Sequence, residues 1–557
     1  MFTSAHMGHY HPLTWLSWAL DHRLWGTDPW GWHLTSVVLH AANAVLVSAL
    51  LEALLVRARV GGAATVRVAA AAGALVWALH PQRVEPVVWV TERRDVLSGG
   101  LYLVAVLAYL RAHAGAELRR GWWAASLVAC ALSLLAKAWA MTLPVVLLVL
   151  DAYPLRRTDR SGWRRLVVEK VPYAVLAAAS AAAAAYAQRT AGAMLSLEDL
   201  GLGARLVQAL YGPAFYVWKA VAPVGLSPLY PIESFRADAP AVLAAAAAAL
   251  LVTVAVVAGR RRWPAAAAAW ISYLLVLAPV LGLAQSGMQF AADRYTYLAT
   301  IPLIALVAGG VVRWLEARPG HAAGVLPAAA AAAIALALAT RALIPVWTDD
   351  HTLWSRVVAM YPASHNAWHN LGLGRLSAGD RGGLADLDRA IALAPDFAPA
   401  FNSRGAVREA AGDLAGARAD LDRAIALAPT WPDPYNNRGN VRLAAGDVAG
   451  AIDDYDRVLE MAPNHLRARF NRALARERQG DMAGGLADLA ALLAAAPDYA
   501  HGYATRVRFR AALGDFTGAL ADCDTALRLL PPGSRDAEIV AGYRRTLEAR
   551  LAADQRK

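Results

Sequence analysis

A proline recurs every 34 residues in the C-terminal third of the chain, at Pro395, Pro429, Pro463, Pro497 and Pro531, and this period constrains the fold more than any other feature. A glycine–aspartate pair keeps the same period, at Gly412-Asp413, Gly446-Asp447, Gly480-Asp481 and Gly514-Asp515. Self-similarity at a fixed period is typical of solenoids, in which each helical unit buries its apolar face against its neighbours. The sequence therefore predicts an all-α solenoid in this part of the chain.

A helix–turn–helix unit of 34 residues is typical of the tetratricopeptide repeat. We predict five such repeats over residues 364–532, the first of them one residue short at its turn, and a capping helix and tail over residues 533–557. The prolines would end each unit, because proline cannot continue a helix. Small residues would let the two helices of a repeat approach closely, at Gly405 and Gly439 in the first helix and at Ala417, Ala451 and Ala519 in the second.

A repeat array is a binding surface, and a row of amides is expected to line its concave groove. Asn402 and Asn436 occupy one position of the first helix in successive repeats, and Asn437 and Asn471 occupy the next position. An amide can donate and accept at once, so such a row suits the backbone of an extended peptide. Ordinary surface polarity explains the same residues equally well.

Long apolar runs fill the chain up to about Pro345 and then stop. The chain is 58% hydrophobic and only 17% charged, which excludes a single soluble domain. We predict a polytopic α-helical membrane domain over residues 1–345 and a linker over 346–363. Residues 204–222 are amphipathic and broken by Pro213, which favours a position along the membrane interface. The ten predicted spans cover residues 33–55, 68–80, 96–111, 122–136, 139–151, 171–187, 240–258, 265–284, 296–313 and 324–344.

Arginine and lysine gather in every second loop between these runs, as the positive-inside rule requires of cytoplasmic loops. The rich loops hold Arg57, Arg59 and Arg67; Arg111, Arg119 and Arg120; Arg156, Arg157, Arg160, Arg164, Arg165 and Lys170; Arg260, Arg261 and Arg262; and Arg313 and Arg318. The loops at 80–95, 137–138, 188–239 and 284–295 would then be extracytoplasmic, and so would the repeats. Much of the net charge of +11 lies in the rich loops, so no nucleic-acid partner is expected.

The stretch from His80 to Leu97, HPQRVEPVVWVTERRDVL, holds six charged residues between two apolar runs. Ionisable groups this close to a bilayer are expensive, and they usually face a cavity or a water-filled site. One interpretation is a solvated loop with snorkelling arginines. The other is an acid or base beside cations that hold an anionic, lipid-linked substrate. The residues alone leave both open.

Four stretches of the chain carry a family resemblance. They read YHPLTWLSWALDHRLWG from Tyr10, GWHLTSVVLHAANAVL from Gly31, HPQRVEPVVWVTERRDVL from His80 and AQSGMQFAADRYTYL from Ala284. Together with the repeats, they resemble the transmembrane and tetratricopeptide-repeat O-mannosyltransferases and their bacterial relatives, within the GT-C glycosyltransferase superfamily. The resemblance implies about eleven membrane helices, a polyprenyl-phosphate sugar as donor, and sugar transfer on the extracytoplasmic side, where the repeats would also lie. For this chain the expected membrane is the bacterial inner membrane.

Members of this family place acidic catalytic residues in a first extracytoplasmic loop, ahead of the stretch that begins here at Tyr10. This chain has no Asp or Glu before Asp21. We therefore expect that it lacks the first membrane helix and the first extracytoplasmic loop. Either the given start is late, or this is an inactive member.

Transfer from a lipid phosphate needs cations that neutralise the leaving group and a carboxylate that takes the acceptor's proton. Glu85 is the first candidate carboxylate and Asp95 the second. Asp293 would either bind substrate or form a local ion pair at the interface. The expected substrate- and phosphate-binding set is Arg93, Arg94, Lys137, Arg294, Asp293, His80 and His11.

The histidines form no compact, ligand-spaced cluster, so no metal site is expected among His9, His11, His33, His40 and His80. No cofactor is certain, and the participation of a divalent metal stays open. We interpret the chain as a membrane glycosyltransferase that transfers a sugar, such as mannose, from a polyprenyl-phosphate donor to a protein acceptor recruited by the repeats. The alternative is a non-catalytic, membrane-anchored repeat scaffold for protein–protein interaction.

Overall fold

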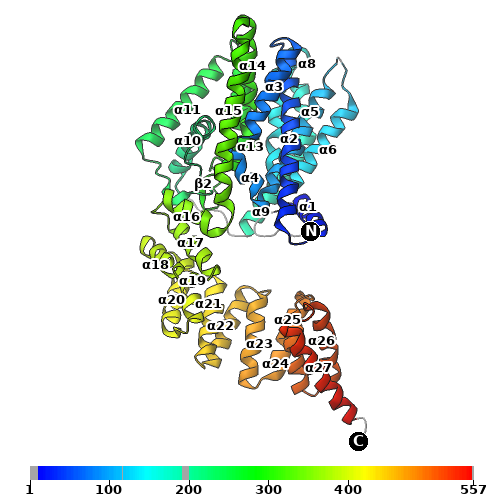
Figure 1. The fold of residues 1–557 in the computed structure, drawn as a ribbon, viewed down its shortest axis with the longest axis vertical. Helices are drawn as coiled ribbons and strands as arrows, with labels where there is room; N and C mark the ends of the chain where they lie inside the picture. Colours follow the sequence, from blue (N-terminus) through cyan, green and yellow to red (C-terminus); the bar gives the residue numbers. More distant parts are fainter. Residues whose placement is uncertain (1–9, 116, 191–199, 286, 555–557) are drawn as a thin grey trace. The chain divides into compact units, whose positions relative to one another are not determined.

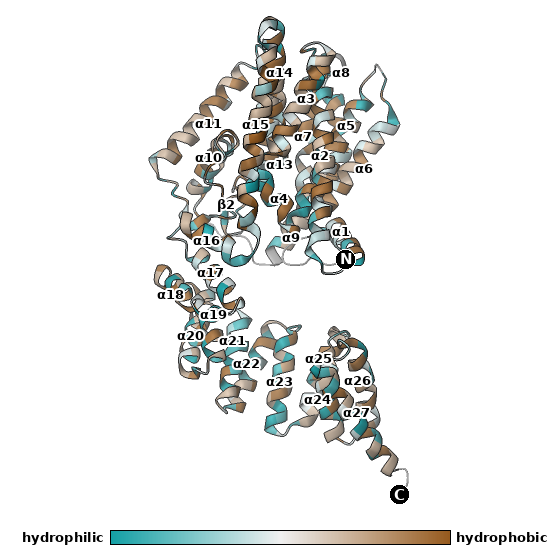
Figure 2. Cartoon of the chain, viewed as in Figure 1, coloured by the Kyte–Doolittle hydropathy of each residue, from teal (hydrophilic) through white to brown (hydrophobic). Residues whose placement is uncertain are grey.

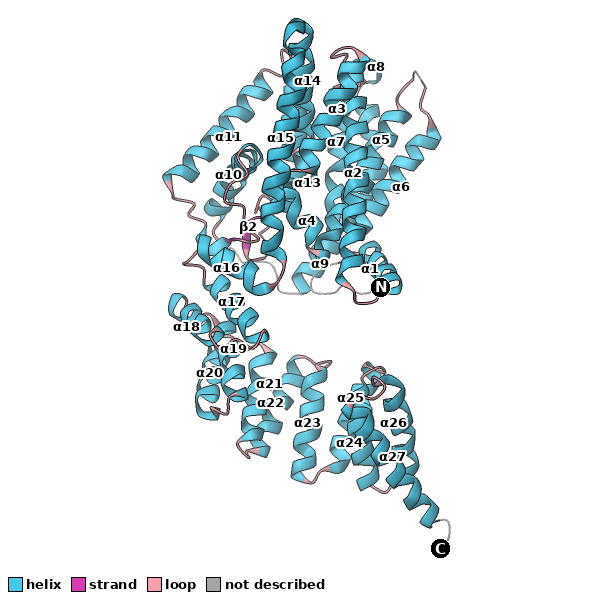
Figure 3. Ribbon diagram, in the orientation of Figure 1, coloured by secondary structure: helices cyan, strands magenta, loops and turns pink. Residues whose placement is uncertain are grey.

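The computed structural model describes residues 10–115, 117–190, 200–285 and 287–554, and nearly all of its regular structure is helical (Figure 1, Figure 3). Two compact units divide the chain, Met1–Ala367 and Trp368–Lys557. One short antiparallel pair, β1 (Tyr230–Pro231) and β2 (Gln289–Ala291), is the only sheet in the described ranges. The predicted class, a helical membrane domain followed by a tetratricopeptide solenoid, is confirmed.

The first unit is a bundle of helices. Figure 2 shows hydrophobic residues along the middle of these helices and hydrophilic residues toward their ends. The helices are α1 (Pro12–Trp25), α2 (Pro29–Arg57), α3 (Ala63–Ala78), α4 (Val84–Val88), α5 (Arg93–Ala112), α6 (Arg120–Ala136), α7 (Leu143–Ala152), α8 (Thr158–Ser161), α9 (Trp163–Thr190), α10 (Leu202–Val221), α11 (Pro240–Ala258), α12 (Pro264–Leu277), α13 (Thr296–Ala299), α14 (Ile301–Ala317), α15 (Ala322–Leu343) and α16 (Asp350–Met360). Short 3-10 turns used below are η1 (Pro81–Arg83), η2 (Val90–Glu92), η3 (Ala138–Thr142), η5 (Ala278–Val280), η6 (Asp293–Tyr295) and η8 (Ile344–Trp347).

Among the described residues, five helices are long and apolar enough to cross a membrane, and two bent pairs would raise that number to seven. One pair joins α3 to η1–α4 at 61°, and the other joins η6–α13 to α14 at 54°. Shorter apolar helices coincide with the remaining predicted spans, at α6, η3–α7 and α12–η5. The amphipathic helix α10 is not among the helices that pass this test. Helix α16 occupies most of the stretch predicted as a linker.

Helix α5 is central to the bundle, since it packs against α2, α6 and η3 and its Val96, Leu103 and Tyr109 are at most 1% exposed. Its 20 residues span about 30 Å, which equals the usual thickness of a bilayer's hydrocarbon core. Charged residues gather at both of its ends. Each end of α5 is therefore placed to lie near one face of a membrane.

The second unit consists of helix pairs that stack in sequence order. The pairs are α17 (His365–Ser377) with α18 (Gly383–Leu393), α19 (Ala398–Ala410) with α20 (Leu414–Leu427), α21 (Pro432–Ala444) with α22 (Val448–Met461), α23 (Leu466–Gln479) with α24 (Met482–Ala495), and α25 (Ala500–Ala512) with α26 (Phe516–Leu529). Helix α27 (Arg535–Asp554) follows them. Each predicted repeat corresponds to one pair.

The periodic glycine–aspartate pairs form the turn inside each of the last four repeats. Gly412 adopts a φ of +84°, a left-handed conformation that favours glycine, and Asp413 caps α20 by accepting a hydrogen bond from the Gly416 N–H at 2.9 Å. The three later repeats use the same device. Close helix packing also follows the prediction, because a Cβ on Gly439 would lie 2.6 Å from the Tyr455 ring.

Arginines of the first helices connect the repeats, in a pattern that we call the arginine ladder. Arg404 pairs with Asp420 of its own repeat at 2.6 Å and with Asp388 of the preceding repeat at 2.6 Å. Arg438 and Arg472 repeat this arrangement 34 and 68 residues later. The Asp420 side chain is buried, whereas Asp388 is exposed. One set of pairs thus closes each repeat, and the other joins it to its neighbour.

Candidate substrate-binding site

Six ionisable side chains from distant parts of the chain meet at the N-terminal end of α5, and we call them the Glu92 cluster. They come from α4, η2, the first turn of α5, the residue after α6, and η6. Its members are the carboxylates Glu85, Glu92 and Asp95 and the cations Arg94, Lys137 and Arg294. Five of the nine residues predicted as catalytic or substrate-binding therefore lie in one place.

Glu92 is the central acceptor of the cluster. Its Oε2 accepts hydrogen bonds from Arg94 Nε and from Lys137 Nζ, both at 3.0 Å, and its Oε1 lies 3.5 Å from Arg294 Nε. The Glu92 side chain is fully buried. A buried carboxylate is tolerated when it is paired and hydrogen-bonded, so these three cations account for its position. Sequence analysis counted Glu92 among the charged residues of its stretch but did not select it.

Asp95 and Lys137 form the side of the cluster that faces η3. Lys137 Nζ lies 2.8 Å from Asp95 Oδ1 and donates a hydrogen bond to Asp95 Oδ2 at 2.9 Å. The Trp139 indole N–H donates a further hydrogen bond to Oδ1 of the same carboxylate. The Lys137 ammonium also lies 5.7 Å from the Trp139 ring centroid, within cation–π range. Lys137 ends α6, and its extended backbone directs the chain into η3. Lys137 is thus held by two carboxylates, Glu92 and Asp95.

Glu85 and Arg294 join the two bent spans of the unit. Glu85 accepts a hydrogen bond from the backbone N–H of Arg294 at 2.8 Å, and it also pairs with the guanidinium of Arg294. That guanidinium lies between two aromatic rings, 5.6 Å from the centroid of Trp89 and 5.0 Å from that of Tyr295. The short arms of the two bent spans, η1–α4 and η6–α13, therefore meet at one ion pair.

The cations and the carboxylates of the cluster differ in exposure. The side chains of Arg94, Lys137 and Arg294 are 15%, 17% and 10% exposed, whereas the three carboxylates are at most 3% exposed. The carboxylates therefore lie behind the cations. An anion that approaches the cluster would meet positive groups first. Glu85 lies behind Arg294 and Asp95 behind Lys137, and each carboxylate pairs with its cation. From these positions the two carboxylates can hold the cations in place.

Arg93 lies apart from its predicted partners. Its guanidinium pairs with Asp21 of α1, and it donates hydrogen bonds to Ser36 Oγ at 3.2 Å and to the Trp32 carbonyl oxygen at 2.7 Å. Its side chain is fully buried. Consecutive residues of a helix point about 100° apart, which separates Arg93 from Arg94. Arg93 thus lies outside the Glu92 cluster, and it ties α5 to α1 and α2.

The remaining candidates surround the cluster or lie elsewhere. Asp293 accepts a hydrogen bond from the Tyr230 hydroxyl at 3.1 Å, and Arg294 pairs instead with Glu85 and Glu92. Burial, with the Asp293 carboxylate second, raises the pKa of Tyr230 well above its usual value, so this hydroxyl stays protonated and donates. His80 Nε2 contacts the carbonyl oxygen of Ala220 at 3.0 Å.

His11 precedes α1 and is partly buried, and His9 lies outside the described residues. Within the described ranges, no group of three or more His, Cys, Asp or Glu side chains is arranged to hold a metal ion.

A second charged cluster, which sequence analysis did not select, lies at the opposite end of α5. Asp151 accepts hydrogen bonds from the Tyr109 hydroxyl at 2.7 Å, from Lys170 Nζ at 2.6 Å and from Arg157 Nη1 at 2.8 Å. Its side chain is fully buried. Arg157 and Lys170 belong to a loop that the arginine pattern assigns to the cytoplasm, and Tyr109 and Asp151 lie near the ends of the predicted spans 96–111 and 139–151. The two clusters thus mark two ends of the bundle.

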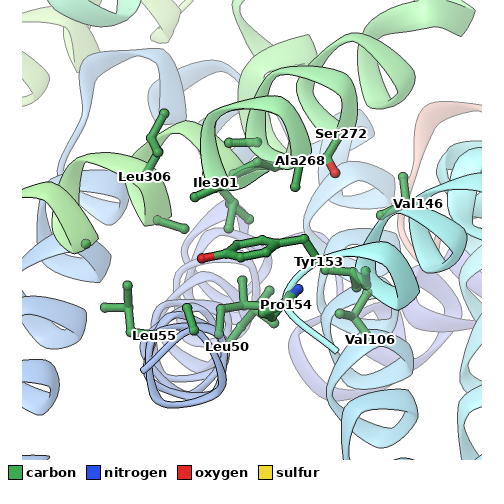
Figure 4. A pocket seen from close by; sticks show the side chains of 18 of the residues that line it. Leu50, Leu55, Val106, Val146, Tyr153, Pro154, Ala268, Ser272, Ile301 and Leu306 are labelled. Carbon is green, nitrogen blue, oxygen red and sulfur yellow. The ribbon is translucent and has the colours of Figure 1, made fainter. Parts of the chain in front are cut away.

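An apolar cavity of about 260 Å³ also lies near that opposite end. Figure 4 shows the Tyr153 ring extending across it, with Leu50 and Leu55 on one side and Ile301 and Leu306 on the other. The lining is almost wholly hydrocarbon. This cavity offers no set of convergent charged groups, in contrast with the Glu92 cluster.

The asparagine row of the repeats is hydrogen-bonded along its length. Asn437 donates to Asn402 Oδ1 at 2.9 Å, and Asn471 donates to Asn436 Oδ1 at 3.1 Å. Asn471 also donates to Asn440, which sequence analysis missed because it lies one helical turn further along. Asn436 is buried, whereas Asn402, Asn437 and Asn471 are partly exposed. Neighbouring first helices are therefore joined by these amides.

Comparison with known proteins gives partial matches, and no family model matches the chain. Protein O-mannosyl-transferase TMTC2 of Mus musculus is 31% identical over 151 residues, which are 27% of this chain and 17% of that protein. Protein O-mannosyl-transferase Tmtc2 of Drosophila melanogaster is 35% identical over 153 residues, 27% of this chain and 15% of that protein. The matches thus span less than a fifth of the length of these relatives.

Two solved structures also align with part of the chain. The structure of YrrB, a TPR protein with an unusual peptide-binding site, is 18% identical, with a TM-score of 0.28, and covers 34% of this chain and 97% of that one. The structure of Pseudomonas aeruginosa pilF is 17% identical, with a TM-score of 0.31, and covers 35% of this chain and 88% of that one. The curated matches confirm the predicted resemblance: this chain is similar to the TMTC protein O-mannosyl-transferases.

Proposed function

We propose that this chain is a membrane glycosyltransferase that moves a sugar from a polyprenyl-phosphate donor to a protein acceptor bound by the repeats. The observation that carries the proposal is the Glu92 cluster, where three partly exposed cations stand in front of three buried carboxylates. The similarity to protein O-mannosyl-transferases supports it.

Lipid phosphate is a leaving group whose negative charge grows as the bond to the sugar breaks. Arg94 and Arg294 could each donate two parallel N–H groups to its oxygens, and Lys137 would act as a point charge. Preorganised donors of this kind stabilise the transition state, because they need no rearrangement when the charge develops. In this proposal Glu85 and Asp95 remain the nearest carboxylates to the reaction, and they also fix the directions of Arg294 and Lys137.

The acceptor would be a peptide that lies against the asparagine row. Each amide has two N–H donors and a carbonyl acceptor, and the bond from Asn437 to Asn402 uses one donor and one lone pair. The partly exposed members of the row, Asn402, Asn437 and Asn471, thus retain groups that suit a peptide backbone. In this proposal the repeats and the Glu92 cluster both face the extracytoplasmic side of a bacterial inner membrane.

A non-catalytic scaffold is the alternative, and one observation favours it. The three cations of the cluster are matched by three carboxylates, so their charges are already balanced without a substrate. A purely structural cluster would have the same composition. The two functions differ in what happens when one cation is removed.

The test is sugar transfer from polyprenyl-phosphate donors in membranes that hold this protein, or any longer product of its gene, at matched expression. Arg94→Ala and Lys137→Ala should each lower the rate about 10²–10³-fold, because each removes a preorganised cation. Glu85→Gln should lower it as well, because Arg294 loses one of its two ionic partners. Arg260→Ala, in an exposed turn after α11, is the matched control and should retain the rate.

Two results would contradict the proposal. Unchanged transfer in all three cluster variants would mean that the reaction occurs elsewhere. Absence of transfer by the wild type across a panel of lipid-linked sugars would favour the scaffold.

A further inference from the structure

The apolar cavity in Figure 4 is about as deep as one leaflet of a bilayer. Helix α14 lines it from Ile301 to Arg313, which is twelve helical steps or about 18 Å. One leaflet of a bilayer core is about 15 Å thick. Ala58 after α2, Ala265 at the start of α12 and Arg313 near the end of α14 also line it. One end of the cavity is therefore bordered by the loops between helices.

Four arginines from four of these loops lie along that end of the cavity, and we call them the arginine rim. Each of them lines the cavity or lies within three residues of a residue that does. They are Arg59 after α2, Arg156 after α7, Arg262 before α12 and Arg313 near the end of α14. All four are exposed, and all belong to the arginine-rich set that is predicted to face the cytoplasm.

The loop after α2 is held against the end of α14. The Gly62 N–H donates a hydrogen bond to Glu316 Oε1 at 2.8 Å. The same loop approaches α14 so closely that a Cβ on Gly61 would lie 2.5 Å from Val312. Arg59, which opens this loop, is thus held next to the segment that carries Arg313.

The arginines of the rim have no carboxylate partner within the part of the chain that the structure describes. Glu316, the acid nearest to Arg313 in the sequence, is bonded to the Gly62 N–H. The Arg262 guanidinium lies 5.5 Å from the centroid of its neighbour Trp263, a contact that leaves its charge unbalanced. In the Glu92 cluster, by contrast, every cation is paired. The rim therefore has positive charge that an anion could neutralise.

Two of the four arginines adopt a backbone conformation that favours glycine. The φ angles of Arg59 and Arg156 are +52° and +50°, and no other non-glycine residue in the described ranges has a positive φ. This conformation is unusual for a residue with a Cβ, and such backbone strain gathers at functional sites. Glycine would relieve the strain at both positions. The geometry of the two loops alone therefore does not account for their arginines.

We propose that the cavity and the arginine rim bind one anionic phospholipid of the cytoplasmic leaflet, with an acyl chain in the cavity and the phosphate on the rim. Guanidinium groups suit phosphate, because they donate two parallel N–H groups to its oxygens. Basic pockets between membrane helices on the cytoplasmic side hold anionic headgroups in the same way. The cavity lies near the end of α5 opposite the Glu92 cluster, so this inference does not rest on the proposed function.

The experiment places the purified full chain in phosphatidylcholine vesicles that contain a photoreactive phosphatidylglycerol, and it measures and maps the label. Arg59→Gly combined with Arg156→Gly removes two cations and relieves both left-handed residues, and labelling should fall about tenfold. Arg119→Gly combined with Arg120→Gly is the matched control. These two exposed arginines lie in another loop of the arginine-rich set, away from every lining residue, and labelling should be retained.

Gly310→Leu tests the cavity itself. A Cβ at Gly310, which lines the cavity, would meet no atom within 4 Å, so a leucine side chain has room to enter. Labelling should fall by about fivefold or more, because the leucine takes the space of the acyl chain. Gly324→Leu on α15 is the matched control, since its Cβ is equally free and it does not line the cavity.

Labelling unchanged in both the rim variant and Gly310→Leu would overturn the inference, and so would an equal fall in the control variants. Equal labelling by a photoreactive phosphatidylcholine would indicate bulk lipid and overturn it as well. So would a polyisoprenyl phosphate that competes as well as unlabelled phosphatidylglycerol does. If Gly310→Leu fails to accumulate, Ala268→Leu fills the cavity from α12, and the mapped wild-type label gives a second answer. Label on α2, α5, α7, α12 or α14 supports the site, and label confined to the other helices contradicts it.

Discussion

The two adjacent arginines at the start of α5, Arg93 and Arg94, have different roles: the first joins helices and the second belongs to the candidate site. Arg93 is fully buried against Asp21, whereas Arg94 is 15% exposed and belongs to the Glu92 cluster. The sequence RRD shows two cations and an acid but not their directions, which depend on where the surrounding helices pack. This contrast leads to opposite expectations for stability and activity.

Arg93→Ala should destabilise the protein far more than Arg94→Ala. Removing one partner of a buried ion pair leaves the other charge uncompensated, which typically costs about 3–5 kcal/mol. Arg94→Ala should cost less, because the buried Glu92 keeps Lys137 and Arg294 as partners. Thermal unfolding of the two variants in the same detergent measures the difference. Equal loss of stability would show that Arg93 has no special structural role.

The candidate site could be predicted in part from the sequence. Lys137 and Arg294 were found because charged residues beside apolar runs are costly and therefore functional or paired. Glu92 was not selected, because its importance comes from Lys137 and Arg294, which lie 45 and 202 residues away. Pairing between distant segments is set by tertiary packing, which no local pattern in one sequence records.

At the scale of elements, the helix pairs of the repeats could be predicted closely from the sequence, because the residues that form each turn, cap and helix end lie within one 34-residue period. The turn glycine, the capping aspartate and the terminal proline all act within a few residues of their own position. The membrane helices were also predictable, since long apolar runs specify them. The meeting of the two bent spans was not, because Glu85 and Arg294, which pair there, are 209 residues apart.

The arginine ladder has one weaker step. Arg506 pairs with Asp522 of its own repeat, but the position that corresponds to Asp388, Asp422 and Asp456 is Ala490. Ala490→Asp should restore the link between α24 and α25. The added pair would be exposed, so the expected gain is about 0.2–1 kcal/mol.

The measurement is urea unfolding of residues 364–557, which contain all the helix pairs that pack on one another. Ala487→Asp is the matched control, because it adds the same charge to an exposed position on the same helix, three residues earlier. High salt should remove most of the gain. An equal effect of the two substitutions would show that the charge acts generally and not through Arg506.

At the scale of the whole molecule, the distribution of charge gives the two ends of the membrane unit different characters. The Asp151 cluster lies among arginine-rich loops, which the positive-inside rule assigns to the cytoplasm. The Glu92 cluster lies at the other end of the 20-residue helix α5. Helix α5 crosses the membrane once between the two clusters, so the Glu92 cluster is expected on the extracytoplasmic side. The arginine-rich loops and the course of α5 thus predict the same orientation of the membrane unit.

The repeats are therefore expected outside the cytoplasm, on the same side as the Glu92 cluster. The last predicted span, 324–344, leaves the loop that contains Arg313 and Arg318, so the chain that follows it should emerge on the opposite face. A reporter that is active only in the cytoplasm, fused after Lys557, should be silent, and the same reporter inserted after Arg261 should be active. A periplasm-dependent reporter at the two positions should give the inverse pattern. Strong cytoplasmic activity after Lys557 would reverse the orientation, and it would separate the repeats from the side on which a lipid-linked donor is proposed to react.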